Sequence, residues 1–497
     1  MKSNNKSLKS KVLYGLFWRF MERSGTQGIQ FVVSIILARL LLPKDFGIIG
    51  LITVYIEIAN VFIQSGFGTA LIQKKEVDDE DYSSVFYLSL ILSAVLYLIL
   101  FFTAPLIARF YSEPMLVQIL RILSFTLILG VINSIQFTVI SREMKFKKSF
   151  VVSLGGVFVS ALVGVTMAYR GYGIWSLVFS QISGQVTSTI ILWFTVRWRP
   201  KLLFSFKKIK ELFKFGSNLL ISGLLDSLFN NLFPLIIGKL FGSTMLGYYN
   251  RGQSFPSLMV NNIDGTIVGV MFPALSKFQN DRVQVKKIVR RMLVTSSFFV
   301  IPIMVGLAVV ARPLVILLLT DKWIPCVPFL QFACITYALW PIFTANLQAI
   351  TAVGRSDIFL RLEIIKKVLL VVVILISVHY GIYAMLIGSA IVSFVSAVIN
   401  ASPNKKLLNY SYKEQLHDIM PSILLSATMC LVVLVVSLLS FSLWLVFILQ
   451  IIVGAVFYFG VAYLLKFECF LYILNLFKDA IDKNFKQRRN NNFNNKL

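Results

Sequence analysis

The sequence predicts an all-α polytopic membrane protein with about fourteen transmembrane helices. Its 497 residues are 57% hydrophobic and 14% charged, whereas soluble domains are about 45–50% apolar and about 25% charged. About fourteen runs of roughly 20 mainly apolar residues, the length that crosses about 30 Å of hydrocarbon, can be drawn between Val12 and Lys466. The first six runs recur in the next six, which indicates an internal repeat.

The order of these runs predicts how the chain is divided. Helices 1 to 6 form an N-terminal bundle at residues 1–200, and helices 7 to 12 form a C-terminal bundle at residues 201–402. Helices 13 and 14, at residues 403–466, have no counterpart in the repeat, and residues 467–497 form a basic tail. The expected spans are 12–40, 45–71, 82–110, 116–140, 149–169, 173–196, 212–241, 245–272, 289–312, 328–352, 357–379, 381–401, 417–439 and 441–466.

The first span has the basic flank of a signal peptide, but its apolar run is too long and lacks a small-residue cleavage site. We therefore expect a retained first helix. Most of the 48 lysines and arginines lie in alternate connections and at both ends of the chain, which predicts cytoplasmic termini and argues against a nucleic-acid partner. The cations of the tail are expected to fix this topology or to contact anionic membrane lipids.

The repeat rests on short matches that occur in the same order in both halves. Residues 36–47 correspond to residues 236–247, with isoleucine, leucine, glycine and a cation at matching places. Transporters are often built from such repeats, with the substrate site between them. The repeat therefore predicts a transporter. The later matches are Ala70-Leu71 with Ala274-Leu275, Pro105-Leu106 with Pro313-Leu314, Gln136 with Gln348, and Tyr172-Gly173-Ile174 with Tyr380-Gly381-Ile382.

Both repeats begin with a helix that carries a polar stripe. Spacings of three and four residues place such side chains on one helical face, and charged groups within a membrane avoid lipid. We expect these faces to line a wet cavity. The stripe of helix 1 is Arg19, Glu22, Arg23, Thr26, Gln30 and Ser34, and that of helix 7 is Ser222, Asp226 and Asn230.

The second helix of each repeat continues the pattern. An alternative is that some of these charges pair and merely hold helices together, as Arg19 could with Glu22. Arg39 and Lys239 lie near helix ends, where long cationic side chains can also reach the membrane interface. The polar residues are Glu57, Asn60 and Gln64 in helix 2, and Arg251, Ser254, Asn261 and Asp264 in helix 8.

Prolines within the expected spans predict bends. Pro234, Pro256 and Pro341 each fall inside a long apolar run, and proline removes a backbone donor and disturbs the preceding turn. A carrier that alternates access needs such bendable segments. The prolines are consistent with motion but identify no hinge.

Several motifs resemble one known family, the Wzx-like polysaccharide flippases of the multidrug/oligosaccharidyl-lipid/polysaccharide exporter superfamily. The likeness runs from about Leu8 to Leu465 and is greatest for the branch with colanic-acid-type and teichuronic-type exporters. The order and spacing of the motifs carry it. They are residues 37–43 (LARLLLP) with Phe46-Gly47, residues 66–73 (GFGTALIQ), residues 246–251 (LGYYNR), residues 272–276 (FPALS), and residues 321–323 (DKW) with residues 328–331 (PFLQ).

The resemblance implies a V-shaped carrier of two six-helix bundles with two additional C-terminal helices. It implies that the cargo is an oligosaccharide linked to polyprenyl diphosphate, which moves to the outer leaflet by alternating access. Such export serves lipopolysaccharide O-antigen, capsule or exopolysaccharide synthesis at the bacterial plasma (inner) membrane. A polysaccharide polymerase and other export-machinery proteins are the expected partners.

The expected cargo gives the polar residues their roles. Arginine suits a diphosphate because its planar fork donates two bonds to phosphate oxygens. No phosphate-binding loop for ATP is visible, so proton or sodium gradients or the cargo gradient supply the energy. We expect no metal and no cofactor. The head-group candidates are Arg19, Arg23 and Arg251, then Lys239 and Arg39; the other cavity residues are Gln30, Asn230 and Asn261; the ion-coupling candidates are Glu22, Glu57, Asp226 and Asp264.

Three rival functions share the membrane location. A multidrug extrusion carrier of the same superfamily should have a cavity dominated by carboxylates and aromatics, whereas here cations are at least as many. A peptidoglycan lipid-precursor flippase of the same superfamily is a second alternative. A membrane glycan polymerase or ligase needs acid or base residues on a sizeable outer loop, and the expected outer loops are short. We therefore expect no enzyme.

Overall fold

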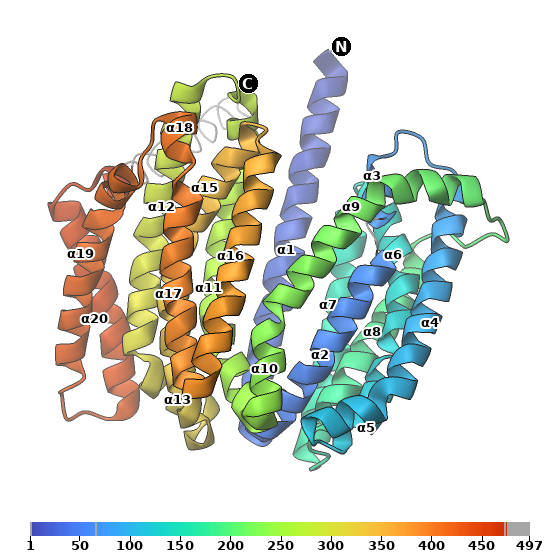
Figure 1. Ribbon diagram of the computed structural model, residues 1–497, viewed down its shortest axis with the longest axis horizontal. Coiled ribbons are helices and arrows are strands. Elements are labelled where there is room, and N and C mark those ends of the chain that lie inside the picture. Colours follow the sequence, from blue (N-terminus) through green and yellow to red (C-terminus); the bar gives the residue numbers. More distant parts are fainter. Residues whose placement is uncertain (1, 65–66, 472–473, 475–497) are drawn as a thin grey trace, which may run out of the picture. The chain divides into compact units, whose positions relative to one another are not determined.

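The computed structural model describes residues 2–64, 67–471 and 474, and within them the chain is helical without strands. It contains two compact units, residues 1–250 and residues 251–497. Figure 1 colours the chain along its sequence, from blue at the N-terminus to red. An all-α membrane protein is therefore confirmed. The bundle bounds at residues 200, 402 and 466 stay predictions, as does the division of the tail at residue 467.

Unit 1 begins with a long helix that packs against α7, and its later helix α9 packs across α2, α3 and α4. Its helices are α1 (Lys2–Leu40), α2 (Pro43–Gln64), α3 (Phe67–Gln73), α4 (Asp79–Tyr111), α5 (Met115–Leu123), α6 (Thr126–Arg142), α7 (Phe146–Tyr169), α8 (Trp175–Thr195), α9 (Phe206–Asn230) and α10 (Leu232–Leu240). Helix α11 (Gly242–Lys277) starts in unit 1 and continues into unit 2.

Unit 2 is organised around α12, which packs against α14, α15 and α19. Besides the end of α11, its helices are α12 (Arg282–Val309), α13 (Ala311–Leu319), η1 (Asp321–Cys326), α14 (Val327–Ala338), α15 (Trp340–Ala352), α16 (Ser356–Ser377), η2 (Val378–Tyr380), α17 (Ile382–Ala401), α18 (Asn404–Leu408), α19 (Tyr412–Val436) and α20 (Leu443–Leu464).

Eleven helical segments among the described residues are long and apolar enough to cross a membrane. The remaining three expected spans fall on α1, α11 and α16, whose polar and charged residues set them apart from these segments. The count of fourteen therefore stays a prediction. Two spans are interrupted just before a proline, at Asn231 before Pro234 and at Leu339 before Pro341, whereas α11 continues through Pro256.

Small residues bring α7 and α8 together. A Cβ on Gly156 would lie 2.1 Å from the hydroxyl of Ser188, and one on Gly184 would lie 2.9 Å from Cβ of Ser160. Ser160 and Ser180 also share a hydrogen bond of 2.8 Å between their hydroxyls. Such close approach is the usual way that helices associate in membranes, where burial of apolar surface supplies little drive.

The two glycines that the repeat aligns, Gly47 and Gly247, contact each other's helix. A Cβ on Gly47 would lie 1.7 Å from the carbonyl oxygen of Ser243, and one on Gly247 would lie 2.0 Å from that of Pro43. The starts of α2 and α11 therefore pack backbone against backbone. We call this contact the glycine crossing.

The first of the two C-terminal helices, α19, is joined to the rest of unit 2 by buried amides. Asn346 of α15 donates to Oε1 of Gln415 of α19 at 2.7 Å, and Gln415 and Asn404 both donate to Oδ1 of Asn346, at 2.9 and 2.7 Å. All three side chains are at most 1% exposed. Because each side chain bonds at least one of the others, the cluster holds α15, α18 and α19 together.

Candidate functional site

Most of the predicted site residues lie in unit 1. Only three lie in unit 2, all on α11. The unit 1 residues are Arg19, Glu22, Arg23, Gln30 and Arg39 on α1, Glu57 on α2, Asp226 and Asn230 on α9, and Lys239 on α10; those of unit 2 are Arg251, Asn261 and Asp264.

Arg19 and Arg23 are exposed on the same face of α1, because they are four residues apart. The guanidinium of Arg19 lies 4.9 Å from the ring centroid of Phe146, at the start of α7. An aromatic ring in this position supports the side chain without consuming its hydrogen-bond donors. Arg19 is thereby held with its planar fork available to an anion. Gln30, two turns further on, is exposed as well.

Glu22 lies between these arginines in sequence but bonds to α7. The hydroxyls of Ser149 and Ser153 donate to Oε1 of Glu22 at 2.8 and 2.7 Å. The other oxygen, Oε2, is buried and has no hydrogen-bond partner. A carboxylate that is buried with one oxygen unsatisfied gains from a proton or a cation. The described hydrogen bonds of the carboxylate go to serines rather than to Arg19.

Glu57 joins α2 to the junction between α9 and α10. Its Oε2 accepts a hydrogen bond of 3.1 Å from the amide of Asn231, which also donates to the carbonyl of Ser227. Asn230 and Asp226, which the sequence singled out, are exposed on α9. The predicted polar face is therefore present, and the residue that bonds Glu57 is the neighbour of the predicted one.

The side chain of Lys239, on α10, contacts the last turn of α4. Its Nζ donates to the carbonyl of Phe110 at 2.5 Å and lies 4.4 Å from the ring centroid of the same residue. The last carbonyls of a helix lack partners within it and attract cations. This contact favours the helix-end interpretation of Lys239 over a role in the cavity. Arg39 is exposed in the last turn of α1.

The three residues of α11 differ in exposure. Arg251 is 8% exposed and its guanidinium lies 5.4 Å from the ring centroid of Phe255. A contact between Arg251 and a head group would therefore require this part of α11 to move. Asn261 is exposed, and Asp264 accepts a hydrogen bond of 3.3 Å from the indole of Trp340.

Four partners were absent from the sequence analysis: Ser149, Ser153, Asn231 and Trp340. Ser149 and Ser153 are four residues apart, so a polar face on α7 could have been read from the sequence. Nothing in the sequence indicated that this face meets Glu22. Asn231 and Trp340 lie at helix breaks, where the expected continuous spans placed the side chains differently.

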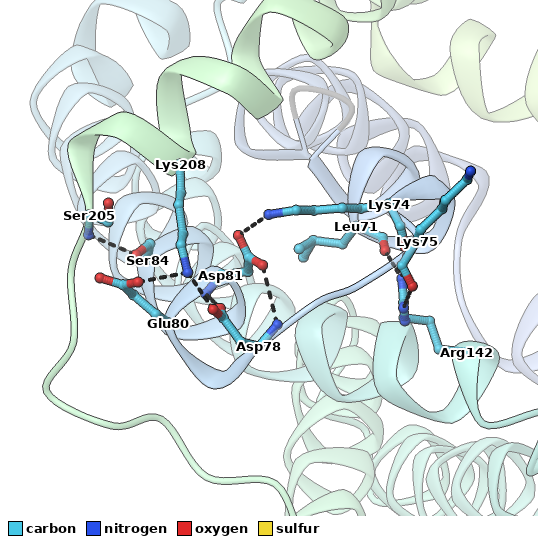
Figure 2. Close-up of polar contacts among 10 residues, drawn as sticks. All are labelled: Leu71, Lys74, Lys75, Asp78, Glu80, Asp81, Ser84, Arg142, Ser205 and Lys208. Atoms are coloured by element: carbon cyan, nitrogen blue, oxygen red, sulfur yellow. Dashed lines mark hydrogen bonds and ion pairs between the residues drawn. The ribbon is translucent and has the colours of Figure 1, made fainter.

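A second polar cluster in unit 1 surrounds the start of α4 (Figure 2). Asp78 and Asp81 form a capping box, and Lys208 of α9 bridges Asp78 and Glu80 at 2.5 and 2.6 Å. The Lys208 ammonium lowers the pKa of Asp78 to about 2. Lys74 pairs with Asp81 at 2.6 Å. We call these residues the acidic cap.

Arg142, at the end of α6, completes this region by donating to the carbonyls of Leu71, Lys74 and Lys75. It thereby supplies donors to one carbonyl in the last turn of α3 and to two in the loop that follows the helix. Because every charged group drawn in Figure 2 other than Lys75 contacts a neighbour, the acidic cap and Arg142 connect helices and offer no obvious ligand site.

Comparison with known proteins places this chain in a family. The family described as "Polysaccharide biosynthesis protein" matches residues 36–328. The teichuronic acid biosynthesis protein TuaB of Bacillus subtilis is 25% identical over 87% of this chain and 90% of its own length. The lipopolysaccharide biosynthesis protein WzxC of Escherichia coli is 24% identical over 82% and 84%. The succinoglycan biosynthesis transport protein ExoT of Rhizobium meliloti is 23% identical over 71% of each.

Solved structures share the fold. Lipid II flippase MurJ in an inward closed conformation matches with a TM-score of 0.73 at 15% identity, covering 90% of this chain and 98% of that one. An inward-facing multidrug resistance MATE family transporter matches with a TM-score of 0.62 at 17% identity, covering 78% and 98%. The resemblance seen in the motifs is thus confirmed, and the chain belongs to the polysaccharide biosynthesis protein family.

Proposed function

We propose that this chain is a flippase that moves polyprenyl-diphosphate-linked oligosaccharides from the cytoplasmic to the outer leaflet of the bacterial plasma membrane. Family membership carries the proposal, together with relatives named for polysaccharide biosynthesis and transport. The cargo supplies material for a surface polysaccharide. The protein acts as a carrier and not as an enzyme, and it requires no cofactor or metal.

The polar side chains of unit 1 meet the physical demand of this cargo. A glycan and a diphosphate cannot cross hydrocarbon bare, because each unsatisfied polar group costs several kcal/mol there. Exposed Arg19, Arg23, Gln30, Glu57 and Asp226 lie on helices of a membrane protein. Charged groups in membrane helices face water or partners rather than lipid, so these side chains supply a hydrophilic surface for the cargo.

Arg19 and Arg23 bind the diphosphate in this proposal. Their side chains are exposed, lie on one face of α1 and project from neighbouring turns. Two guanidinium groups at this spacing can each donate two bonds to phosphate oxygens. Arg251 joins them when its part of α11 becomes accessible, and Asn230 and Asn261 contact the sugars.

Glu22 is the leading candidate for coupling to an ion gradient, because Oε2 is buried without a partner. Uptake of a proton or sodium ion would neutralise the carboxylate, and one charge that moves across 100 mV supplies about 2.3 kcal/mol. Glu57, Asp226 and Asp264 are the other candidates. Both termini are cytoplasmic in this proposal, and a polysaccharide polymerase receives the exported units.

Arginine replacement tests the proposal. Arg19→Ala and Arg251→Ala should each lower glycan export at least about tenfold, because a lost charge-assisted hydrogen bond costs about 1.5–3 kcal/mol. Export is measured as surface polysaccharide per unit of protein in the membrane. Arg312→Ala removes an exposed arginine of α13 and should export within about twofold of the wild type. Wild-type export by both Arg19→Ala and Arg251→Ala would contradict the proposal.

A further inference from the structure

A cavity of about 1000 Å³ lies in unit 2, where α11 ends and α12 begins. Its walls are the last turns of α11, the first turns of α12 and the segment that follows α20. Apolar surface comes from Met271 of α11, Phe278 just after that helix, Ile288 and Val294 of α12, and Leu471. The volume is at the upper end of the range of about 300–1,000 Å³ typical of small-molecule sites.

The segment after α20 is fixed against α12 and thereby forms one wall. The ring of Phe470 lies 6.2 Å from that of Phe298 and 6.1 Å from that of Phe459. The thiol of Cys469 lies 3.7 Å from the hydroxyl of Thr295. Tyr458 of α20 donates a hydrogen bond of 2.8 Å to the carbonyl of Phe298. These contacts hold the segment after α20 in place as a wall of the cavity.

The charges of the cavity are not balanced. Arg290 pairs with Asp418 at 3.0 Å and with Glu468 at 3.4 Å, so its charge is already matched by carboxylates. Lys287 and Arg291 also line the cavity and are exposed. Within the part of the chain that the structure describes, Lys287 forms no ion pair. Counted over its lining residues, the cavity has three cations, Lys287, Arg290 and Arg291, and one carboxylate, Glu468.

The arrangement of these residues along α12 is amphipathic. Gln284, Lys287 and Arg291 recur every three or four residues and share one face, and Val294 continues that face one turn deeper. Each turn advances about 5.4 Å along the helix. The cations thus lie at the end of the cavity nearest the membrane surface, while its apolar wall extends toward the membrane interior.

We propose that this cavity binds an anionic phospholipid of the bilayer, with the lipid phosphate at Lys287 and Arg291 and an acyl chain along the apolar wall. Basic pockets at the ends of membrane helices are suited to such head groups, because each nearby cation adds to the attraction for negatively charged lipid. The bound lipid contacts α11, α12 and the segment after α20 together. It therefore stabilises unit 2.

A second cavity in unit 2 has a smaller excess of positive charge. The smaller one, of about 520 Å³, is lined by Lys286, Arg290, Lys413, Glu414 and Asp418 together with Tyr410 and His417. Lys286 pairs with Glu414 at 3.4 Å, and Tyr410 donates to Asp418 at 2.6 Å. Two of its three cations, Lys286 and Arg290, are thus paired with carboxylates. Lys413 is exposed there and provides a matched control.

The test uses the full chain, purified and placed in nanodiscs of phosphatidylcholine with increasing phosphatidylglycerol. Phosphatidylglycerol should raise the melting temperature of the wild type, because a ligand that binds the folded state stabilises it. The double variant Lys287→Gln/Arg291→Gln should need at least about tenfold more phosphatidylglycerol for the same rise. Lys413→Gln should behave like the wild type. Native mass spectrometry should show bound phosphatidylglycerol reduced in the double variant.

Three results would overturn the proposal. The first is an unchanged response of the double variant to phosphatidylglycerol. The second is an equal loss in Lys413→Gln, which would indicate attraction to the charged surface as a whole. The third is stabilisation by inorganic phosphate or polyprenyl diphosphate without any by phosphatidylglycerol. Because the readout is lipid binding, each result leaves the proposed transport function unaffected.

Discussion

Two helix contacts in unit 1, the glycine crossing and the acidic cap, depend on different forces. At the glycine crossing, the backbones of α2 and α11 touch, and a Cβ at Gly47 would lie 1.7 Å from a carbonyl oxygen. At the acidic cap, Lys208 joins α9 to Asp78 and Glu80 at the start of α4, and these three side chains are partly exposed. The first contact depends on shape and tolerates no added atom. The second depends on charge and can loosen gradually as salt or pH changes.

The glycine crossing should give the largest effect. Gly47→Ala forces α2 and α11 apart, and overpacking of this kind costs about 1–3 kcal/mol or more. We expect a lower melting temperature of the purified protein and reduced glycan export. Gly28→Ala is the matched control, because nothing lies within 4 Å of its Cβ position and alanine favours a helix. Equal stability of Gly47→Ala and Gly28→Ala would show that the backbones do not meet.

An ion pair beside the glycine crossing should give an intermediate effect. Glu113 pairs with Lys44 at 3.0 Å and accepts a hydrogen bond of 2.5 Å from Ser243. Glu113→Gln removes the charge but keeps an acceptor, so we expect a loss of at most about 1 kcal/mol. Thermal unfolding measures it. Glu143→Gln, which disrupts only an exposed pair with Lys145, should change stability less; the reverse order would contradict this comparison.

The acidic cap should give the smallest effect, and that effect should depend on salt. Lys208→Gln leaves Asp78 and Glu80 without their shared cation, but these side chains are partly exposed and screened. The melting temperature should fall slightly at low salt and match the wild type near 1 M salt. Lys210→Gln, an exposed neighbour, is the control. A large loss that persists in high salt would place the pair in a buried setting instead.

The pH dependence of the acidic cap follows from its pKa values. The pKa of Asp78 falls from 3.8 to about 2, and that of Lys208 rises above 10.5. A lowered carboxyl pKa stabilises the fold above about pH 4, and this contribution is lost as the pH falls through about 2. A raised lysine pKa stabilises the fold below about pH 10 and is lost above it. The difference between wild type and Lys208→Gln should therefore be constant between about pH 4 and pH 10.

The sequence predicted the helices better than their interruptions. Hydropathy located the apolar runs, because burial in lipid requires about 20 apolar residues whatever the tertiary contacts. The breaks at Asn231 and Leu339 precede prolines that the sequence already marked. Pro256 carries the same mark, yet α11 continues through it. Whether a proline ends a helix depends on the packing around it, which a single sequence does not contain.

The candidate site was predicted in part. Periodicity placed Arg19, Glu22 and Arg23 on one side of α1, and the structure leaves both arginines exposed. It could not reveal that Glu22 bonds to Ser149 and Ser153, because that pairing depends on how α1 packs against α7. The burial of Arg251 was likewise invisible, since a polar stripe shows which face is hydrophilic but not what covers it.

The amide cluster of unit 2 illustrates the same limit. Asn346 is a polar residue within an expected membrane span, but it is fully buried and bonded to Gln415 and Asn404. Helix α19, which lacks a counterpart in the repeat, is therefore joined to the second repeat through a polar contact. Polar residues in membrane helices serve packing as well as transport, and only their partners distinguish the two.

The most direct test of the transport function is the location of lipid-linked oligosaccharide in cells that lack this protein. Deletion of the gene should cause the polyprenyl-diphosphate-linked oligosaccharide to accumulate on the cytoplasmic side of the plasma membrane, and the wild-type gene should reverse this accumulation. Arg19→Ala should not reverse it, whereas Arg312→Ala should. Hypersensitivity to drugs without any accumulation of lipid-linked oligosaccharide would contradict the account and indicate a multidrug carrier.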